Sequence, residues 1–302
     1  MTIATATPAP ARSNTARAVL WMFGALISFS IIAVAGREAS KGADTFQIMF
    51  WRSLLGIIVL SLIWFATGGK LRQLTTARIG GHTLRNCIHY AAQYSWLAAL
   101  PLIPLTQLFA VEFTAPLWVA VLAPFILGEK LSSWRLMAAV VGFIGTLIVV
   151  RPGAIPLSTG MIFGLVSALG FALSMIMTKR LTATESAFKI LFYMQVLQTI
   201  IGAVPMVSRM TVPEPVTAGW IALVGICGLS AHFCSIRAFM LADAIIVAPL
   251  DFLRLPLIAL AAALIYNEGI DPWVLAGGAV VIAGNVINMF GERLRAKAAR
   301  AS

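Results

Sequence analysis

Charge is scarce in this 302-residue sequence: Asp, Glu, Lys and Arg make up 11% of it, against 60% for apolar residues. A soluble domain of this length needs far more charge to keep its surface hydrated, whereas apolar side chains on a membrane protein face lipid. The net charge is +11. Because the basic residues form short clusters between apolar runs, they favour lipid headgroups as partners rather than nucleic acid.

Several chemical signatures are also missing. The three cysteines, Cys87, Cys227 and Cys234, lie in apolar runs without a CxxC spacing, and no two histidines stand at ligand spacing. We therefore expect neither disulfides nor a metal site. No Walker-type phosphate loop occurs, so we expect no ATP-driven step and no cofactor. The connections also lack the acid-rich loops that a membrane-embedded transferase would need.

Ten continuous apolar runs are long enough to cross a bilayer as helices, which takes about 20 residues. They lie at approximately 18–36, 46–67, 82–100, 104–127, 133–150, 159–178, 187–208, 217–240, 244–266 and 272–290. A membrane β-barrel would instead show alternating segments of about ten residues. The sequence therefore predicts an all-α integral membrane protein with ten transmembrane helices and no soluble domain.

The first run has an alternative interpretation. Residues 33–35 (Ala-Val-Ala) resemble a signal-peptidase site, which would make this run a cleaved signal peptide. However, residues 22–24 (Met-Phe-Gly) resemble 162–164 (Ile-Phe-Gly) in the sixth run, which cannot be a signal peptide. We therefore predict that the first run is a true span, preceded by a disordered segment at 1–16.

The basic residues predict the orientation. If the N-terminus is cytoplasmic, 15 of the 22 Lys and Arg residues fall in inner segments, four fall in outer segments and three lie within spans. Because cytoplasmic segments carry the excess of Lys and Arg, we expect both termini in the cytoplasm.

An internal repeat divides the chain. With a shift of 139 residues, 95–150 aligns with 234–289 without a gap. The aligned pairs include Glu129 with Glu268, Trp134 with Trp273, and Glu112 with Asp251. Five spans per half is an odd number, so the second half must enter the membrane from the other side. Such inverted repeats are common in secondary transporters, whose site lies near the midplane between the halves.

The repeat ends carry a family resemblance. Residues 115–117 (Ala-Pro-Leu), 125–134 (Phe-Ile-Leu-Gly-Glu-Lys-Leu-Ser-Ser-Trp) and 141–153, which end in Arg-Pro-Gly, resemble the end of an EamA domain. This domain characterises the drug/metabolite transporter superfamily. The resemblance covers nearly the whole chain after residue 17. It implies EamA repeats at 17–153 and 157–292, followed by a basic tail at 293–302.

The resemblance also implies a function. Members of this superfamily in the bacterial cytoplasmic membrane carry amino acids and their metabolites outward, or carry riboflavin or S-adenosylmethionine. It implies a cavity lined mainly by helices 1, 3, 4, 6, 8 and 9, with the fifth helix of each half as scaffold. We expect alternating-access transport of an amphoteric solute such as an amino acid, with export favoured. A vitamin or nucleoside-like solute is the alternative, and a membrane-embedded transferase is the alternative of another class.

Ionisable side chains inside the spans mark the candidate site, because each costs about 2.5 kcal/mol or more at the bilayer centre. Glu112 and Asp251 are repeat mates, which suits one acid near each gate. Structural ion pairs are the alternative: Arg52 with Glu112, and Asp251 with Arg254 or Arg237. Three arginines face two acids, so one positive charge is left over. We select Arg254 to meet a substrate carboxylate or phosphate, and expect Arg237 to reach the inner surface.

Polar faces on the third and eighth runs extend this site. His89, Gln93 and Trp96 share one helix face, and His232 and Phe239 lie on the repeat-related helix. Both histidines either line a cavity, where they could titrate near neutral pH, or pack as hydrogen-bonded residues. The predicted cavity residues are His89, Gln93, Tyr94, Trp96, Glu112, Phe113, Ser174, His232, Phe239, Asp251 and Arg254.

Proline and small residues predict where helices bend and pack. Pro116 and Pro256 would interrupt the fourth and ninth helices in the middle, as gate hinges or static kinks. Small residues at four-residue spacing in the fifth and tenth helices, such as Ala138 with Gly142, predict either the scaffold interface or a dimer contact. We therefore expect a monomer or homodimer, with lipid, a small molecule and protons as partners.

Overall fold

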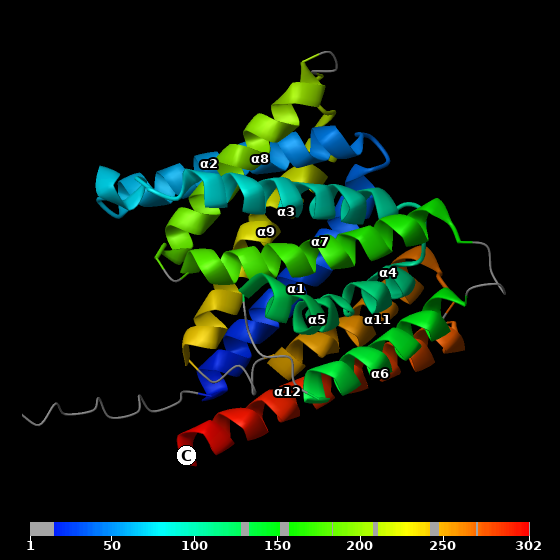
Figure 1. Ribbon diagram of the computed structural model, residues 1–302. Helices are drawn as coiled ribbons and strands as arrows, with labels where there is room; N and C mark the ends of the chain where they lie inside the picture. Colours follow the sequence, from blue (N-terminus) through cyan, green and yellow to red (C-terminus); the bar gives the residue numbers. More distant parts are fainter. Residues whose placement is uncertain are drawn as a thin grey trace, which may run out of the picture.

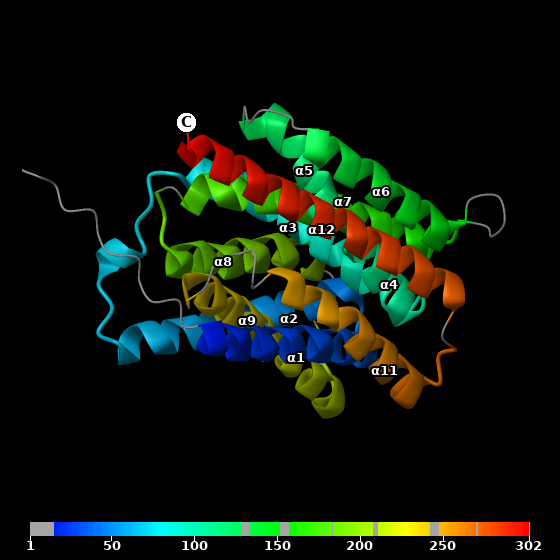
Figure 2. The same ribbon diagram turned by 90° about the horizontal axis from the view of Figure 1, so that it is seen from below.

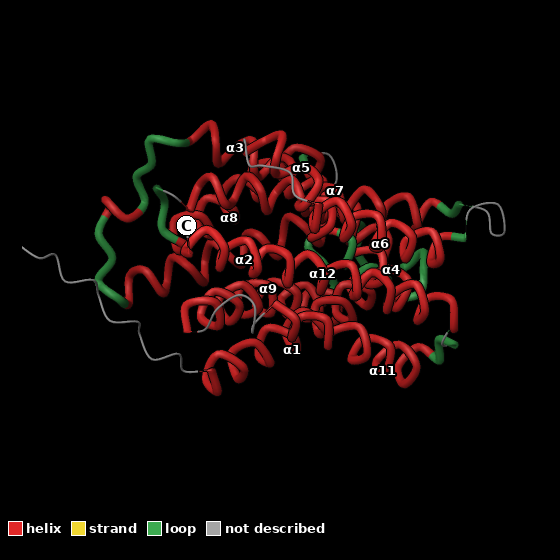
Figure 3. The backbone as a smooth tube through the Cα atoms, turned by 60° about the horizontal axis from the view of Figure 1, so that its bottom comes forward, coloured by secondary structure: helices red, strands yellow, loops and turns green. Residues whose placement is uncertain are grey.

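The computed structural model describes residues 15–127, 133–151, 157–182, 184–207, 211–241, 248–269 and 271–301. Within these ranges the chain forms helices and connections without any strand (Figure 3). The prediction of an all-α protein is therefore confirmed. Glu129, one member of an aligned repeat pair, and the segment 1–14 lie outside the described ranges. Thr15 and Ala16, the last residues of the segment 1–16 that we expected to be disordered, instead begin the first helix.

The helices follow the predicted runs along the chain. The first half contains α1 (Thr15–Ala39), α2 (Thr45–Ala66), the 3-10 helix η1 (Leu71–Gln73), α3 (Ile79–Ala99), α4 (Leu105–Glu112), α5 (Ala115–Leu127) and α6 (Ser133–Val150). The second half contains α7 (Thr159–Thr182), α8 (Ala187–Met206), α9 (Pro215–Leu241), the 3-10 helix η2 (Ala248–Leu253), α11 (Arg254–Tyr266) and α12 (Pro272–Ala301). The last helix continues past the boundary that we predicted at residue 292.

Length and composition support a membrane location for these helices. Seven segments in the described ranges are long and apolar enough to span, with α4 and α5 counted together, and α6 and α11 hold shorter apolar helices. With α3, whose polar face lowers its hydropathy, each of the ten predicted runs has a helical counterpart. Large apolar side chains such as Leu20, Phe65 and Phe125 are 70%, 71% and 77% exposed. In a bilayer these side chains face lipid.

Local sequence explains where α2 begins and α11 ends. Asp44 accepts a hydrogen bond from the backbone N–H of Gln47, and the side-chain oxygen of Gln47 accepts one from the backbone N–H of Asp44. This capping box satisfies donors that the first turn leaves free. Asn267 ends α11 in the left-handed conformation, with φ of 51°, which asparagine tolerates better than most residues.

The fourth predicted helix is broken rather than continuous. The break lies at Phe113 and Thr114, between α4 and α5. The carbonyl oxygen of Phe113 accepts a hydrogen bond of 2.8 Å from Asn285 Nδ2 on α12, which satisfies a backbone group that the break sets free. Pro116 consequently lies in the first turn of α5, where a missing N–H costs little. Our prediction of a proline in mid-helix was wrong here.

The repeat-related ninth helix has a similar interruption. Its described part starts as the 3-10 helix η2, which contains Asp251, and changes to α-helix at Arg254. Pro256 is the third residue of α11, so it too lies in a first turn rather than in mid-helix. Glu112 and Asp251, the two acids that the repeat aligns, therefore both lie where the helix geometry changes. Neither Pro116 nor Pro256 alone predicts these changes.

The helices pack in pairs that respect the repeat (Figures 1 and 2). Repeat-equivalent helices pack on each other: α2 on α8, α4 on α11, and α6 on α12. Two further pairs, α1 with α9 and α3 with α7, join helices that are not equivalent. Because α1 corresponds to α7 and α3 to α9, exchanging the two halves of the chain turns one of these pairs into the other. An approximate two-fold relation between the halves would produce this set of pairs. The opposite direction of the halves in a membrane stays a prediction.

Small residues bring α6 and α12 into close contact. A Cβ atom placed on Gly145 would lie 2.7 Å from the backbone oxygen of Gly277, and one on Gly284 would lie 2.9 Å from the backbone oxygen of Ala138. The two helices run side by side along one side of the molecule (Figures 1 and 2). The small residues therefore serve the scaffold interface within the chain, rather than the alternative that we considered, a dimer contact.

Candidate functional site

The two repeat-related acids share one arginine. Arg254 Nη2 lies 3.2 Å from Glu112 Oε1 and 3.1 Å from Asp251 Oδ2. Trp96 Nε1 on α3 donates a hydrogen bond of 2.7 Å to the second oxygen of Glu112. The side chains of Glu112 and Arg254 are 14% and 8% exposed, and that of Asp251 is 32% exposed. This triad joins α3, the end of α4, η2 and the start of α11.

Aromatic rings surround the shared guanidinium. The Arg254 Cζ atom lies 4.7 Å from the ring centre of Phe29, 5.2 Å from that of Phe109 and 5.3 Å from that of Phe113. Ring faces attract a cation, and they also exclude water from the ion pairs. Phe113 thus lies at the candidate site as we expected, whereas no sequence pattern indicated Phe29 and Phe109.

A second polar cluster lies one helical turn away along α3. Arg52 Nη2 on α2 donates hydrogen bonds of 2.5 Å to Gln93 Oε1 on α3 and 2.8 Å to Gln198 Oε1 on α8. Within the described part of the chain no carboxylate pairs with Arg52. The alternative of an Arg52–Glu112 ion pair is therefore wrong, and so is the choice of Arg254 as the arginine without an acid. Arg254 contacts both acids, which confirms the alternative of an Asp251–Arg254 pair.

The two histidines occupy different surroundings. His89 is buried, and its Nδ1 atom lies 3.0 Å from Ser174 Oγ on α7 in a hydrogen bond. His89 Nε2 has no hydrogen-bond partner among the described residues. His232 is half-buried, and its ring meets the edge of Phe29 at 6.0 Å between centroids. Phe29 therefore contacts both His232 and Arg254, which connects the predicted polar face of α9 to the triad.

The remaining predicted residues lie around this centre or away from it. The ring of Tyr94 lies 4.6 Å from that of Phe46 between centroids and is tilted by 35° against it, on another face of α3 from Gln93 and Trp96. Arg237 is exposed, and its guanidinium lies 5.7 Å from the ring centre of Trp21 rather than against Asp251. The side chain of Phe239 lies outside the described part of the structure. The structure thus brings together most, but not all, of the residues that we selected.

Two interior residues were missed by sequence reasoning. Gln198 is fully buried and holds Arg52; a polar residue inside an apolar run was the signal for it. Arg85, which lies in the third apolar run and was not selected as a site residue, is 6% exposed and donates to Asn86 Oδ1 at 2.8 Å and Thr178 Oγ1 at 3.1 Å. Its place four residues before His89, on the polar face of α3, was the signal.

Polar networks hold the two ends of the bundle. At the end that we predict to be outer, Arg37 donates to Leu100 O at 2.6 Å, to Ile103 O and to the carboxylate of Glu268. Glu268 also accepts from Leu105 N at 2.9 Å. This outer network ties α1, the α3–α4 turn and the end of α11 together.

At the opposite end, Glu185 lies between α7 and α8. Its carboxylate forms an ion pair with the ammonium group of Lys189, 2.7 Å away, and accepts a hydrogen bond from the hydroxyl of Thr76. These two donors lower the pKa of Glu185 below its ordinary value. The carboxylate therefore keeps its charge at neutral pH and ties the segment before α3 to the α7–α8 connection.

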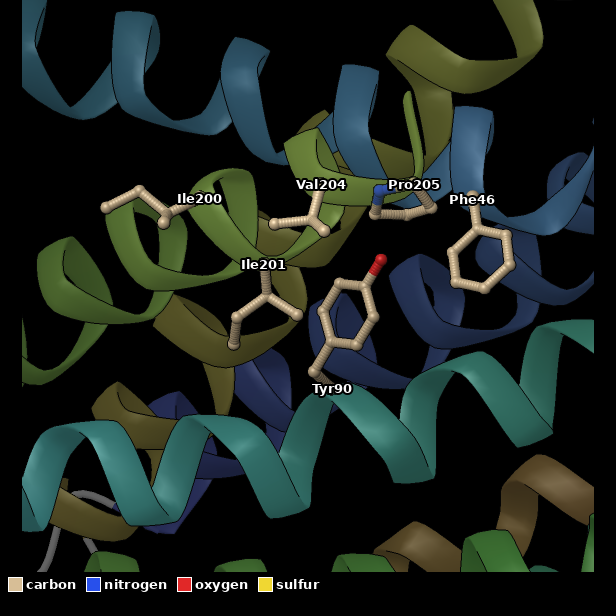
Figure 4. A pocket seen from close by; sticks show the side chains of 6 residues that line it. All are labelled: Phe46, Tyr90, Ile200, Ile201, Val204 and Pro205. Atoms are coloured by element: carbon tan, nitrogen blue, oxygen red, sulfur yellow. The ribbon is translucent and has the colours of Figure 1, made fainter. Parts of the chain in front are cut away.

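An apolar pocket of about 540 Å³ lies between α2, α3 and α8, and no residue of the triad lines it. Phe46, Tyr90, Ile201 and Pro205 line it with two further residues of α8, and the Tyr90 hydroxyl points into it (Figure 4). That hydroxyl has no hydrogen-bond partner among the described residues. Val204 in its wall is 72% exposed. In a bilayer this pocket therefore opens toward lipid, and it differs from the central cavity that we expected.

The fold and the site together define a multi-pass membrane protein with broken, repeat-related helices that meet at a buried ion cluster, as in secondary transporters. The chain belongs to the EamA-like transporter family, whose profile matches residues 16–151 and again 158–290. Both predicted repeats are thereby confirmed. Family membership also makes the protein a transporter rather than the membrane-embedded transferase that we kept as an alternative.

Relatives of this chain are named as transporters of small metabolites. The chain is 28% identical to a protein named S-adenosylmethionine uptake transporter from Rickettsia bellii, over 90% of this chain and 93% of the relative. It is also 28% identical to a riboflavin transporter from Brucella anthropi, over 89% and 96%. A pseudopaline exporter, CntI, from Pseudomonas aeruginosa is 25% identical over 85% and 90%. This protein is accordingly a transporter of small metabolites.

A solved crystal structure supports the fold. It covers 91% of this chain and 98% of its own, with a TM-score of 0.65 and 17% sequence identity. At that identity the similarity concerns the fold alone. The coverage shows that the similarity extends over nearly the whole chain rather than over one half of it.

Proposed function

We propose that this protein moves small amphoteric solutes, amino acids or their derivatives, across the bacterial cytoplasmic membrane by alternating access. The observation that carries this proposal is the triad: two carboxylates, Glu112 and Asp251, share the single guanidinium of Arg254. With all three groups ionised, the triad keeps one net negative charge inside the bundle. A buried charge is costly unless it is paired, so a cationic group on the solute would complete the cluster.

An open hydrogen-bonding position supports this assignment. Asp251 Oδ1 is buried and has no hydrogen-bond partner among the described residues, whereas Asp251 Oδ2 contacts Arg254. The ammonium group of an amino acid supplies the donors that this oxygen lacks. A proton on one of the carboxylates would neutralise the triad in the same way. Solute and proton therefore compete for the same negative charge, which provides a physical basis for proton exchange.

The helix breaks beside the two acids would allow the movement that alternating access requires. Glu112 ends α4 and Asp251 lies in η2, so each acid is attached to a segment that changes direction or geometry beside it. A shift at either break changes which acid Arg254 contacts more closely. Two discrete arrangements of one shared arginine are the kind of bistable contact on which alternating access depends.

The relatives narrow the solutes to test first. S-adenosylmethionine, named in the relative from Rickettsia bellii, is an amino-acid derivative that carries both signs of charge. Riboflavin, named in the relative from Brucella anthropi, is the second candidate, since the rings of Phe29, Phe109 and Phe113 could stack on a flat ring system. The relatives' names include both uptake and export. The export direction that the resemblance implied is therefore tested by measuring transport in both directions.

Transport into proteoliposomes tests the proposal. Purified full-length protein is reconstituted, and movement of radiolabelled S-adenosylmethionine, methionine and riboflavin is followed in both directions, with and without a pH gradient. We expect S-adenosylmethionine or methionine to move faster than in empty vesicles. Movement of riboflavin alone would favour the second candidate. If none of the three moves above the empty-vesicle rate, the proposal loses its support.

A further inference from the structure

Arg52 is a buried cation held by neutral groups. Its side chain is 7% exposed, and its hydrogen-bond partners in the described chain are the amide oxygens of Gln93 and Gln198. Burying a guanidinium without a counter-charge is costly, because amides replace only part of the hydration that the ion loses. The site is therefore preorganised for an anion that the described part of the chain does not supply.

The hydrogen-bond donors left over at this position indicate the chemistry of that anion. Both amide oxygens contact the same nitrogen, Nη2, so Arg52 Nε is left without a partner among the described residues. The amide nitrogen of Gln198, adjacent to the oxygen that holds Arg52, is also buried and unpartnered. An oxyanion has the acceptors that these donors need, and a planar carboxylate matches the guanidinium fork in particular.

The position of Arg52 relative to the triad indicates which anion is involved. Gln93, which contacts Arg52, and Trp96, which contacts Glu112, are three residues apart on α3. Residues at that spacing share one helix face. Arg52 and the triad, whose surplus charges have opposite signs, therefore contact neighbouring turns of α3, which suits a solute that carries both signs. One carboxylate balances the charge of Arg52, whereas a phosphate dianion would leave an excess.

We propose that Arg52, with Gln93 and Gln198, forms the subsite that binds the carboxylate of the transported solute. This inference rests on the proposed function, because it places one end of an amphoteric solute at Arg52 and the other at the triad. The subsite lies between α2, α3 and α8, so the solute would connect these helices to α4, η2 and α11. A purely structural role of Arg52, as a bridge between α2 and α8, is the competing explanation.

Paired ligands that differ by one carboxylate test the subsite. The probes are S-adenosylmethionine against its decarboxylated form, and methionine against methioninol, at matched ionic strength. Binding to full-length protein in detergent is measured by the shift of the melting temperature. We expect the carboxylate member of at least one pair to bind about tenfold more tightly or better in the wild type, as for a hydrogen-bonded ion pair. Arg52→Gln should abolish that difference.

A matched variant controls for the loss of a buried arginine. Arg85→Gln removes a guanidinium that is buried to the same degree but donates to Asn86 and Thr178. It should keep the preference for the carboxylate member. Arg52→Lys, which retains the charge without the fork, should keep part of it. Since Arg52→Gln removes a charge without an acidic partner, its melting temperature without ligand should equal or exceed that of the wild type.

The outcomes separate this inference from the proposed function. Equal binding of both members of each pair to the wild type, including no binding of either, would overturn the carboxylate subsite, and so would a preference that survives Arg52→Gln. Transport in proteoliposomes without any such preference would contradict the subsite alone. A preference that depends on Arg52 in a protein that moves none of the solutes would contradict the proposed function alone.

Discussion

At the scale of single residues, each carboxylate oxygen of Glu112 has its own partner in the candidate site. One of its oxygens contacts Arg254 and the other accepts from Trp96. Glutamine at this position can still accept from the indole, but it removes the negative charge. The charge of Glu112 and its hydrogen bond can therefore be tested separately.

We expect Glu112→Gln to abolish the pH dependence of transport while leaving the fold intact, because the variant triad is neutral without a proton or a solute cation. The measurement is the initial rate of S-adenosylmethionine movement in proteoliposomes from about pH 5.5 to about pH 8, the range in which coupled protons are usually exchanged. Glu214→Gln, at an exposed position just before α9, is the matched control and should behave like the wild type. An unchanged pH profile in Glu112→Gln would assign Glu112 to structure.

Sequence reasoning found the charged groups at this scale but failed in pairing them. Three in-span arginines against two acids predicted one arginine without an acid, whereas Arg254 contacts both acids and neither Arg52 nor Arg237 contacts one among the described residues. The pairing depends on how α4 packs on α11, because that contact places Glu112 against Arg254 rather than against Arg52. No spacing within a single helix contains this information. The choice of Arg254 as the free cation was therefore wrong for a reason that only tertiary packing supplies.

At the scale of helices, close backbone contact between α6 and α12 is the clearest feature. A Cβ atom on Gly145 would lie 2.7 Å from both Gly277 O and Val281 N, which are backbone atoms that cannot move independently of α12. Gly228 in α9 offers a contrast, because a Cβ atom there would meet no heavy atom within 4 Å. The two glycines therefore predict opposite effects of the same substitution.

We expect Gly145→Ala to destabilise the protein by about 1–3 kcal/mol, as for other overpacked interfaces, and to lower its melting temperature in detergent. Gly228→Ala should leave the melting temperature unchanged or raise it, because alanine favours a helix by about 1 kcal/mol over glycine. Parallel melting curves of the two variants make the comparison. Equal stability of both variants would mean that α6 and α12 are not in close backbone contact.

The sequence predicted the helices better than their interruptions. Continuous apolar runs gave the extent of α1, α2 and α7 to within a few residues. The same continuity concealed the break at Phe113 and Thr114, because both residues are compatible with a helix. The break is stabilised by a distant residue, Asn285 on α12, which binds the free carbonyl of Phe113. Pro116 marked the region correctly but suggested a kink rather than the start of a new helix.

At the scale of the whole molecule, the outer network around Arg37 and Glu268 closes one end of the bundle. It joins α1, the α3–α4 turn and the end of α11 through hydrogen bonds to backbone groups as well as through the ion pair. Alternating access requires one end to open while the other stays closed. This network therefore has to break when the end that we predict to be outer opens.

We expect Glu268→Gln to shift the protein toward the form that is open at this end. Thr106, 5% exposed and next to Leu105 in the first turn of α4, can report this shift as Thr106→Cys in a background without the native cysteines. Labelling by a charged thiol reagent should become several-fold faster in Glu268→Gln. Lys41→Gln, which removes an exposed ion pair with Glu38, should not change the rate. Equal labelling rates would show that the outer network does not control access.

Two centres of opposite charge, Arg52 and the triad, contact neighbouring turns of α3, and we propose that they bind the two ends of one solute. A structure of the protein with S-adenosylmethionine bound tests this central claim most directly. Our account predicts the solute between α2, α3 and η2, with its carboxylate at hydrogen-bond distance from Arg52 and a cationic group beside Asp251 or Glu112. A solute in the apolar pocket at Tyr90, or one whose charged groups contact neither Arg52 nor the triad, would contradict it.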